Sequence, residues 1–165
     1  MRPLMPTLAQ VDDMPSLIRH QIPAQWQDSN GHVNVQYYLT LYDRGGWPLL
    51  ESLGIDVARS KQRKYGFFDL EHHVWYLKEI HVGDAVTVHC RLVERGPKRL
   101  HGVMFIANRT RAQLASVMEF LSSAADLEAR KTAEIPPQVA ARIDSMLLTQ
   151  HRYAWPVPLC GAMSV

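Results

Sequence analysis

The spacing of hydrophobic and polar positions changes along the chain, and the changes mark out the expected elements. Between residues 35 and 53 the apolar side chains recur every three, four or seven positions, which predicts a long amphipathic helix. After a basic stretch from Arg59 to Lys64, apolar and polar residues alternate, which predicts strands with one buried face. The expected strands span residues 17–25, 66–80, 86–92, 100–106 and 112–126, and a short terminal helix is expected at 138–148.

Turn-forming residues set the expected limits of the long helix. Residues 28–30, which are Asp, Ser and Asn, supply capping side chains near its expected start, and Gly54 is expected to end it. The segment from Gly45 to Pro48 interrupts the helical pattern. Because proline has no N–H to donate and crowds the preceding turn, we expect the helix to kink or restart there.

The order of the elements is a strand, a helix and then a meander of four strands. A single long helix must lie on one face of the sheet, because short loops cannot cover it. The predicted fold is therefore α+β, an antiparallel sheet of about five strands wrapped around one long central helix. Because such a sheet keeps an open edge and one polar face, we expect pairing with a second copy. This domain is expected at residues 17–136, between an N-terminal arm (1–16), either mobile or facing a partner, and a C-terminal helix and tail (137–165).

Composition narrows the class of protein. The 165 residues suit one domain, and 18 Lys and Arg against 16 Asp and Glu give a formal net charge of +2, which argues against a nucleic-acid-binding surface. Two cysteines, Cys90 and Cys160, cannot form a disulfide framework or alone hold a structural zinc. No apolar run approaches the roughly 20 residues that span a bilayer, and the first residues do not resemble a secretory signal. We therefore expect a cytoplasmic protein without membrane contact.

The segment from Trp26 to Tyr38 carries the candidate chemistry. Asp28 precedes the expected helix, and Gly31 allows a positive φ or the close approach of a ligand. Unpaired N–H groups at a helix start can bind an oxyanion or a polarised carbonyl. A carboxylate beside such donors is what acyl transfer to water requires, and His32 and Asn34 can orient Asp28 or hold the acyl group.

Each of these residues taken alone has a simpler structural interpretation, as a cap, a turn former or an aromatic residue on a helix face. The combination D-x-x-G-H-V-N-x-x-x-Y outweighs it, because it resembles the signature of the hotdog-fold thioesterases of the 4-hydroxybenzoyl-CoA thioesterase-like group. The pattern occupies Asp28, Gly31, His32, Val33, Asn34 and Tyr38. The resemblance covers about residues 17–137 and includes Glu79-Ile80-x-x-Gly83-Asp84, Asp126-Leu127-x-x-Arg130-Lys131 and Ile135-Pro136.

The resemblance implies hydrolysis of acyl-CoA thioesters without a metal or an organic cofactor, since coenzyme A is part of the substrate. It assigns the catalytic carboxylate, as nucleophile or as general base on water, to Asp28, and the N–H that polarises the carbonyl to residues 34–36. It also implies an active site at the interface of a homodimer or of a dimer of dimers (a homotetramer). Val35 stands where the family often has a second asparagine, which predicts a more apolar acyl pocket.

Other candidates are assigned from their place in the pattern. The expected substrate-binding residues are Gly31, Val35, Tyr38, His73 and Trp75. Since His72 and His73 point to opposite faces of a strand, at most one of them can face the site, and no further ligand is spaced to complete a metal site. Trp75 also fits plain sheet packing.

Two groups of side chains could recognise the ends of the substrate. Arg109 and Arg111, or the cluster Lys61, Arg63 and Lys64, are candidates for the CoA phosphates, with Arg109 and Arg111 preferred. An aromatic wall could also hold a cationic acyl group, such as the trimethylammonium of betainyl-CoA. That wall would comprise Trp26, Tyr38, Trp47 and Trp75.

Three classes of function are therefore compared. The first is an acyl-CoA thioesterase that uses Asp28 on a small or medium acyl group. The second is a hotdog hydratase or dehydratase, which would need a catalytic histidine and a carboxylate in a different pattern at the helix start. The third is a non-catalytic module that binds acyl-CoA. A cysteine nucleophile is disfavoured, because Cys90 fits a buried apolar position and Cys160 has no expected base.

Overall fold

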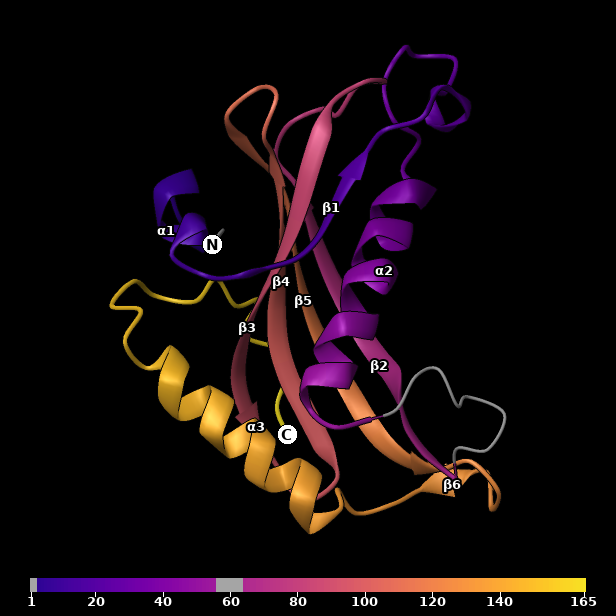
Figure 1. Cartoon of the computed structure of the whole chain (residues 1–165), viewed down its shortest axis with the longest axis vertical. Helices are drawn as coiled ribbons and strands as arrows, with labels where there is room; N and C mark the ends of the chain where they lie inside the picture. Colours follow the sequence, from indigo (N-terminus) through magenta and orange to yellow (C-terminus); the bar gives the residue numbers. More distant parts are fainter. Residues whose placement is uncertain (1–2, 56–63) are drawn as a thin grey trace.

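The computed structural model describes residues 3–55 and 64–165, and the expected α+β hotdog fold is confirmed (Figure 1). Within these residues one antiparallel sheet has the strand order β1-β3-β4-β5-β2, with β6 added to β5. The strands are β1 (Ser16–Gln21), β2 (Tyr65–Tyr76), β3 (Ala85–Arg95), β4 (Arg99–Asn108), β5 (Gln113–Asp126) and β6 (Lys131–Thr132). The helices are α1 (Leu8–Asp12), the 3₁₀ helix η1 (Ala24–Trp26), α2 (Gln36–Ser52) and α3 (Pro137–Gln150).

Helix α2 lies on one face of the curled sheet, and this inner face carries the main core (Figure 1). Leu41 and Tyr42 of α2 are buried against Val88 of β3 and Met104 of β4. Gly45 allows this close approach, because a Cβ atom built there would lie 2.7 Å from Cγ1 of Val88. The helix therefore sits at a depth that a side chain at residue 45 would not permit.

The expected restart of α2 at Pro48 and its expected capping by residues 28–30 are wrong, whereas a kink at Pro48 stays a prediction. The helix continues through Pro48 to Ser52 without a restart, because its packing at Gly45 on the sheet holds it across the one hydrogen bond that proline cannot donate. Residues 28–30 do not cap it either, because the helix begins only at Gln36, whose N–H donates to Oδ1 of Asn34 (3.1 Å).

Neighbouring glycines of α2 give a matched test of this packing. Gly45→Ala should lower the free energy of unfolding by about 1 kcal/mol or more, because overpacking against Val88 outweighs the gain in helix propensity. Gly46→Ala should raise it by up to about 1 kcal/mol, since a Cβ there meets nothing within 4 Å. Urea unfolding of both variants measures the two changes. Equal effects of the two substitutions would contradict the packing of Gly45.

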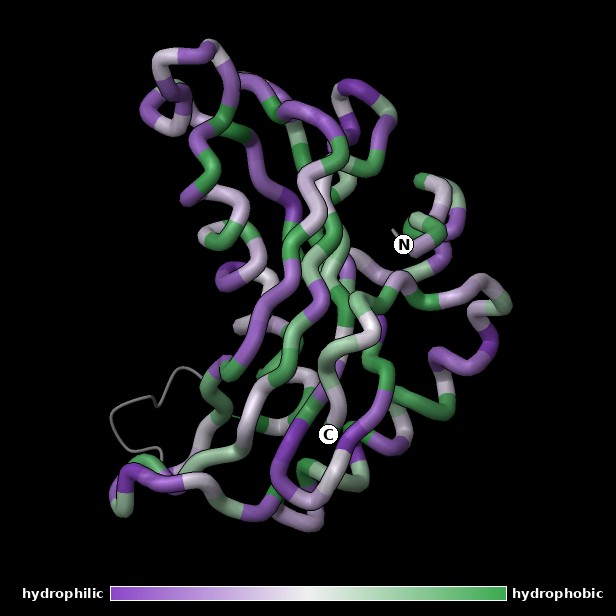
Figure 2. Tube along the Cα trace, turned by 180° about the vertical axis from the view of Figure 1, so that it is seen from behind, coloured by the Kyte–Doolittle hydropathy of each residue, from purple (hydrophilic) through white to green (hydrophobic). Residues whose placement is uncertain are grey.

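The outer face of the sheet is not the polar surface that the alternation in β3 predicted. Thr87 and His89 point to this face but are buried. The reason is that both ends of the described chain fold over the outer face, which is visible from behind in Figure 2. They complete a second apolar cluster, which contains Val11, Met14, Val103, Phe105, Ala107, Val117, Tyr153 and Trp155.

Polar contacts hold both ends in place. Nδ1 of His89 lies 3.0 Å from the carbonyl oxygen of Met14, and Arg109 forms an ion pair with Asp12. At the other end Arg91 donates to the carbonyl oxygens of Tyr153 (2.9 Å) and Trp155 (2.8 Å). The arm, expected to be mobile or partner-facing, therefore contains α1 and packs on its own sheet. Among the described residues, no helix is long and apolar enough to cross a membrane.

Candidate functional site

The loop before α2 holds Asp28 in a compact turn. The N–H of Asn30 donates to Oδ1 of Asp28 (2.8 Å), and Gly31 has a φ of 86°, a conformation that glycine adopts without strain. The N–H of Val33 donates to the carbonyl oxygen of Ile80 (2.8 Å), which ties the loop to the segment that follows β2. The Asp28 side chain is 16% exposed, and its Oδ2 lies 3.5 Å from Nδ1 of His32. The loop therefore presents a shielded carboxylate next to an imidazole.

These residues open onto a cavity of about 480 Å³ at the start of α2. The cavity brings together five of the residues assigned from the sequence: Asp28, His32, Asn34, Val35 and Tyr38. Gly31 shapes the loop beside them. The sequence pattern did not indicate the opposite wall, which consists of Tyr76, Leu77, Lys78 and Glu79. The edge of Tyr38 meets the ring of Tyr76, with centroids 5.1 Å apart, and burial raises the pKa of Tyr38.

The start of α2 leaves one backbone N–H without a partner among the described residues. The N–H of Asn34 donates to the carbonyl oxygen of Trp26 (2.9 Å), and the N–H of Gln36 is taken by Oδ1 of Asn34. The N–H of Val35 donates to no residue in the described parts of the chain. Within the three-residue segment expected to polarise a carbonyl, Val35 is therefore the residue with a free donor.

His73 and Trp75 are not brought to this cavity. On β2 they pair with Glu119 and Val117, whose side chains belong to the outer face. The ring centroids of His73 and Trp75 lie 4.2 Å apart. Trp75 packs on the outer apolar cluster, in line with its simpler interpretation. A role for either in substrate binding stays a prediction.

The arginines expected at the CoA phosphates already have partners. Arg109 donates to Oγ1 of Thr87 (2.7 Å) and pairs with Asp12, while Arg111 donates to a carboxylate oxygen of Asp84 (2.9 Å). Their role in CoA binding stays a prediction. Of the alternative cluster, Lys64 forms an ion pair with Glu128 (3.2 Å), and the other members, Lys61 and Arg63, lie outside the described residues.

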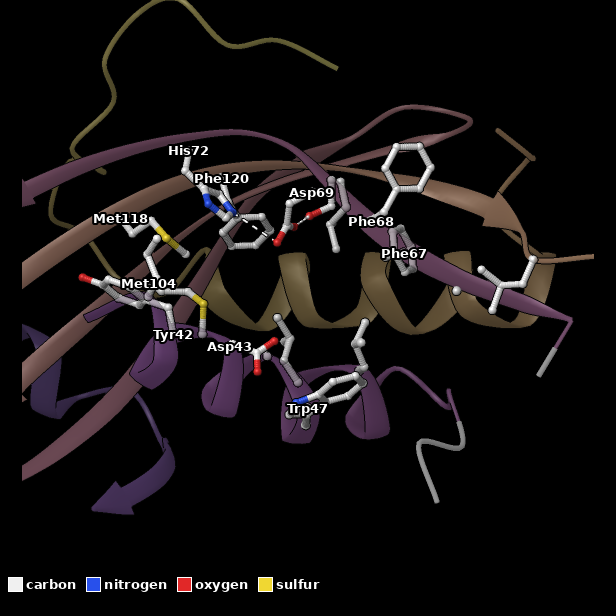
Figure 3. Close-up of a pocket in the computed structure, with 18 residues that line it drawn as sticks. Tyr42, Asp43, Trp47, Phe67, Phe68, Asp69, His72, Met104, Met118 and Phe120 are labelled. Atoms are coloured by element: carbon white, nitrogen blue, oxygen red, sulfur yellow. Dashed lines mark hydrogen bonds and ion pairs between the residues drawn. The ribbon is translucent and has the colours of Figure 1, made fainter. Parts of the chain in front are cut away.

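The four aromatic residues expected to form one wall are distributed over different parts of the fold. Trp26 stacks on Tyr37, Tyr38 lines the cavity at the start of α2, and Trp75 lies on the outer face. Trp47 lines a second cavity of about 430 Å³ between α2 and β2, shown in Figure 3. Its other labelled aromatic residues are Tyr42, Phe67, Phe68 and Phe120.

A β-bulge decides which polar side chains of β2 face this second cavity. The register between β2 and β5 shifts between Asp69 and Glu71, so that Asp69 and His72 both point inward although they are three residues apart. Oδ1 of Asp69 accepts a hydrogen bond from Ser122 (2.5 Å), and its Oδ2 lies 3.1 Å from Nε2 of His72. Burial acts to raise the pKa of Asp69, but these two partners outweigh burial and lower the pKa overall.

The two cysteines lie in different surroundings. Burial raises the pKa of the Cys90 thiol to about 12, which keeps it protonated, and the backbone N–H of Cys160 donates to Glu119 (2.6 Å). Within residues 3–55 and 64–165, no group of three or more His, Cys, Asp or Glu side chains could hold a metal ion.

Comparison with known proteins agrees with this architecture. The family model described as Thioesterase-like superfamily matches residues 22–143. A betainyl-CoA thioesterase of Pseudomonas aeruginosa is 28% identical over 134 residues, which cover 81% of this chain and 83% of that protein. An L-carnitine dehydrogenase/betainyl-CoA thioesterase of Rhizobium meliloti is 26% identical over 127 residues, or 77% of this chain. The match spans only 25% of the length of that relative.

Solved structures share the fold at low sequence identity. A hypothetical protein of Staphylococcus aureus, determined in complex with CoA, superimposes with a TM-score of 0.79 at 22% identity, over 92% of this chain and 96% of that one. A 1,4-dihydroxy-2-naphthoyl-CoA thioesterase of Synechocystis gives a TM-score of 0.68 at 17% identity, over 78% and 95% of the two chains.

Proposed function

Because the chain belongs to the thioesterase-like superfamily, we propose that it hydrolyses an acyl-CoA thioester to a free acid and coenzyme A, with Asp28 as the catalytic carboxylate. One observation carries the assignment to this site. Asp28, whose carboxylate is shielded, and Val35, whose N–H has no partner among the described residues, line the same cavity at the start of α2. Hydrolysis of a thioester needs this pair, a base or nucleophile beside a donor for the carbonyl oxygen.

In the proposed reaction the thioester carbonyl oxygen accepts a hydrogen bond from the N–H of Val35, which stabilises the negative charge that develops on it. Asp28 either takes a proton from the attacking water or attacks the carbonyl carbon itself, forming an anhydride that water then hydrolyses. In both routes the carbon–sulfur bond breaks, the thiolate of coenzyme A leaves, and the acyl group ends as a carboxylic acid. In this proposal His32, whose Nδ1 lies 3.5 Å from Oδ2 of Asp28, orients the carboxylate.

A small or medium acyl group is the proposed substrate, and betainyl-CoA is one candidate because two of the related proteins carry that activity in their names. No metal or organic cofactor is part of the proposal. Thiol release from a panel of short, branched, aromatic, long-chain and quaternary-ammonium acyl-CoAs tests it. Release from at least one member supports hydrolysis. Addition of water to an enoyl-CoA without thiol release would identify a hydratase, and CoA-ester binding without turnover would identify a binding module.

A homodimer built on β2 is the proposed assembly. One edge of β2 pairs with β5, and its other edge has no partner strand in the described chain. An unpaired strand edge with apolar neighbours favours pairing with a second copy. Exposed apolar side chains of β2 and of the neighbouring helix segment flank this edge. They are Val35, Leu39 and Trp47 of the α2 segment and Phe68, Leu70 and Tyr76 of β2.

A charge at this edge should separate the copies. Leu70→Lys, at a residue 43% exposed in the single chain, is expected to convert a dimer to monomers, because the ammonium group would lie in the contact. The matched control is Leu148→Lys on α3, where the leucine is 75% exposed and away from β2. Sedimentation of both variants measures the mass. A Leu70→Lys protein that stays dimeric would contradict the β2 interface.

A further inference from the structure

The cavity between α2 and β2 combines aromatic walls with negative charge. Asp43 projects from α2 and Asp69 from β2 on opposite sides of the opening in Figure 3. Phe67 and Phe68 lie on the strand side, and Tyr42 lies on the helix side. No lysine or arginine is among the described residues that line this cavity. A neutral apolar group would fit the walls, but it would leave Asp43 without a counterion among the described residues, whereas Asp69 has His72 beside it.

The two carboxylates differ in what they still offer a ligand. Asp43 makes no hydrogen bond or ion pair with any residue in the described ranges 3–55 and 64–165. Each oxygen of Asp69 has one partner, Ser122 or His72, and the lowered pKa of Asp69 keeps it ionised, so it contributes negative charge to the cavity. Negative charge beside aromatic walls suits an organic cation with an apolar surface.

We propose that this cavity binds a quaternary-ammonium group, held by the charges of Asp43 and Asp69 and by the aromatic rings around them. A quaternary ammonium has methyl groups in place of N–H donors, and it is attracted both to aromatic faces and to nearby carboxylates. Tyr42, Phe67 and Phe120 provide aromatic rings, and Met104 and Met118 line the cavity with soft apolar atoms near Tyr42. The sequence also predicted this class of ligand, but it assigned the binding to a different set of aromatic residues. Of that set, Trp26, Tyr38, Trp47 and Trp75, only Trp47 lines this cavity.

The place of the cavity relative to the thioester rests on the proposed function and dimer. Asp43 lies seven residues beyond Gln36, which is two turns or roughly 10 Å along α2 from the helix start. Antiparallel pairing of two β2 edges would bring the Tyr76 end of one strand beside the Tyr65 end of the other. The thioester site of one copy would then face the aromatic cavity of its partner, and a short cationic acyl group could reach from one to the other.

Two thioesters that differ in one atom test the charge requirement. Betainyl-CoA carries a trimethylammonium group, and 3,3-dimethylbutanoyl-CoA has the same shape with carbon in place of nitrogen. We expect the ratio of their kcat/KM values to favour the cation by at least about tenfold in the unmodified protein. Asp43→Asn and Asp69→Asn should each lower that ratio by about fivefold, acting on betainyl-CoA alone.

Matched controls separate the cation site from catalysis. Glu51→Gln removes an exposed carboxylate from the same helix outside the cavity, so the ratio should not change. Asp28→Asn should slow both thioesters equally. If the unmodified protein hydrolyses both equally well, or if Asp43→Asn leaves the ratio unchanged, the cation site is refuted while the proposed hydrolysis stands.

If neither thioester is hydrolysed, binding of tetramethylammonium chloride decides the proposal independently of turnover. Saturable shifts of the Phe67 and Phe68 ring signals in NMR spectra, weakened severalfold in Asp43→Asn and kept in Glu51→Gln, would support the site. Absence of binding by the unmodified protein, or equal binding by both variants, would overturn it.

Discussion

Asp28→Asn should reduce thiol release from acyl-CoA by about 10²–10⁴-fold while the protein stays folded. The amide cannot act as base or nucleophile, yet its oxygen can still accept the hydrogen bond that the N–H of Asn30 donates to Oδ1 of Asp28. The turn before α2 should therefore keep its shape, and the loss should fall on kcat more than on KM. Steady-state kinetics with the best substrate of the panel, together with circular dichroism of the variant, measure both effects.

Asp126→Asn is the matched control for this substitution. Oδ1 of Asp126 also accepts backbone N–H groups in a turn, from Glu128 (2.9 Å) and Ala129 (2.8 Å), but it lies outside both cavities. This variant removes the same charge from the same kind of turn. It should keep nearly full activity, because Asp126 does not line either cavity. Near-normal turnover by Asp28→Asn would exclude Asp28 as the catalytic carboxylate and leave the family assignment intact.

Glu119→Leu should lower the free energy of unfolding by about 3 kcal/mol or more. Glu119 has no exposed surface, and its two oxygens accept from Nε2 of His101 (2.8 Å) and from the N–H of Cys160 (2.6 Å). A leucine fills the space but removes the acceptor of the His101 Nε2 and of the Cys160 N–H. A shift of the urea midpoint at unchanged slope would report the loss.

Glu94→Gln gives the comparison for that experiment. Glu94 also contacts His101, with 3.4 Å between Oε1 and Nδ1, but its side chain is 48% exposed to water. Its substitution should cost less than about 1 kcal/mol, because water replaces an exposed partner at little cost. Similar losses for the two variants would show that Glu119 does not anchor the chain end through buried hydrogen bonds.

The elements that the sequence predicted correctly are those whose signal is local. The period of the helix and the alternation in β3 and β4 arise from burial of one face, so they survive in a single chain without any knowledge of contacts. Asp28 and His32 were predicted as neighbours for the same reason, since they lie four positions apart in one loop.

Features that depend on contacts between distant segments could not be predicted in this way. Asp43 meets Asp69 across a cavity only because α2 crosses the inner face next to β2. The burial of His89 depends on an arm 75 residues away in sequence, whose Met14 carbonyl it contacts. Asp69 and His72 both face the cavity although they are three residues apart, and simple alternation along β2 would not predict this because the bulge shifts the pairing register.

The bulge near Leu70 also limits how relatives can be compared position by position. A related chain with one residue fewer at this point of β2 would show the opposite set of side chains to the cavity on one side of the gap, even with identical residues elsewhere. A change in ligand preference within such a group of proteins could then arise from a single insertion or deletion, with no substitution among the residues that line the cavity.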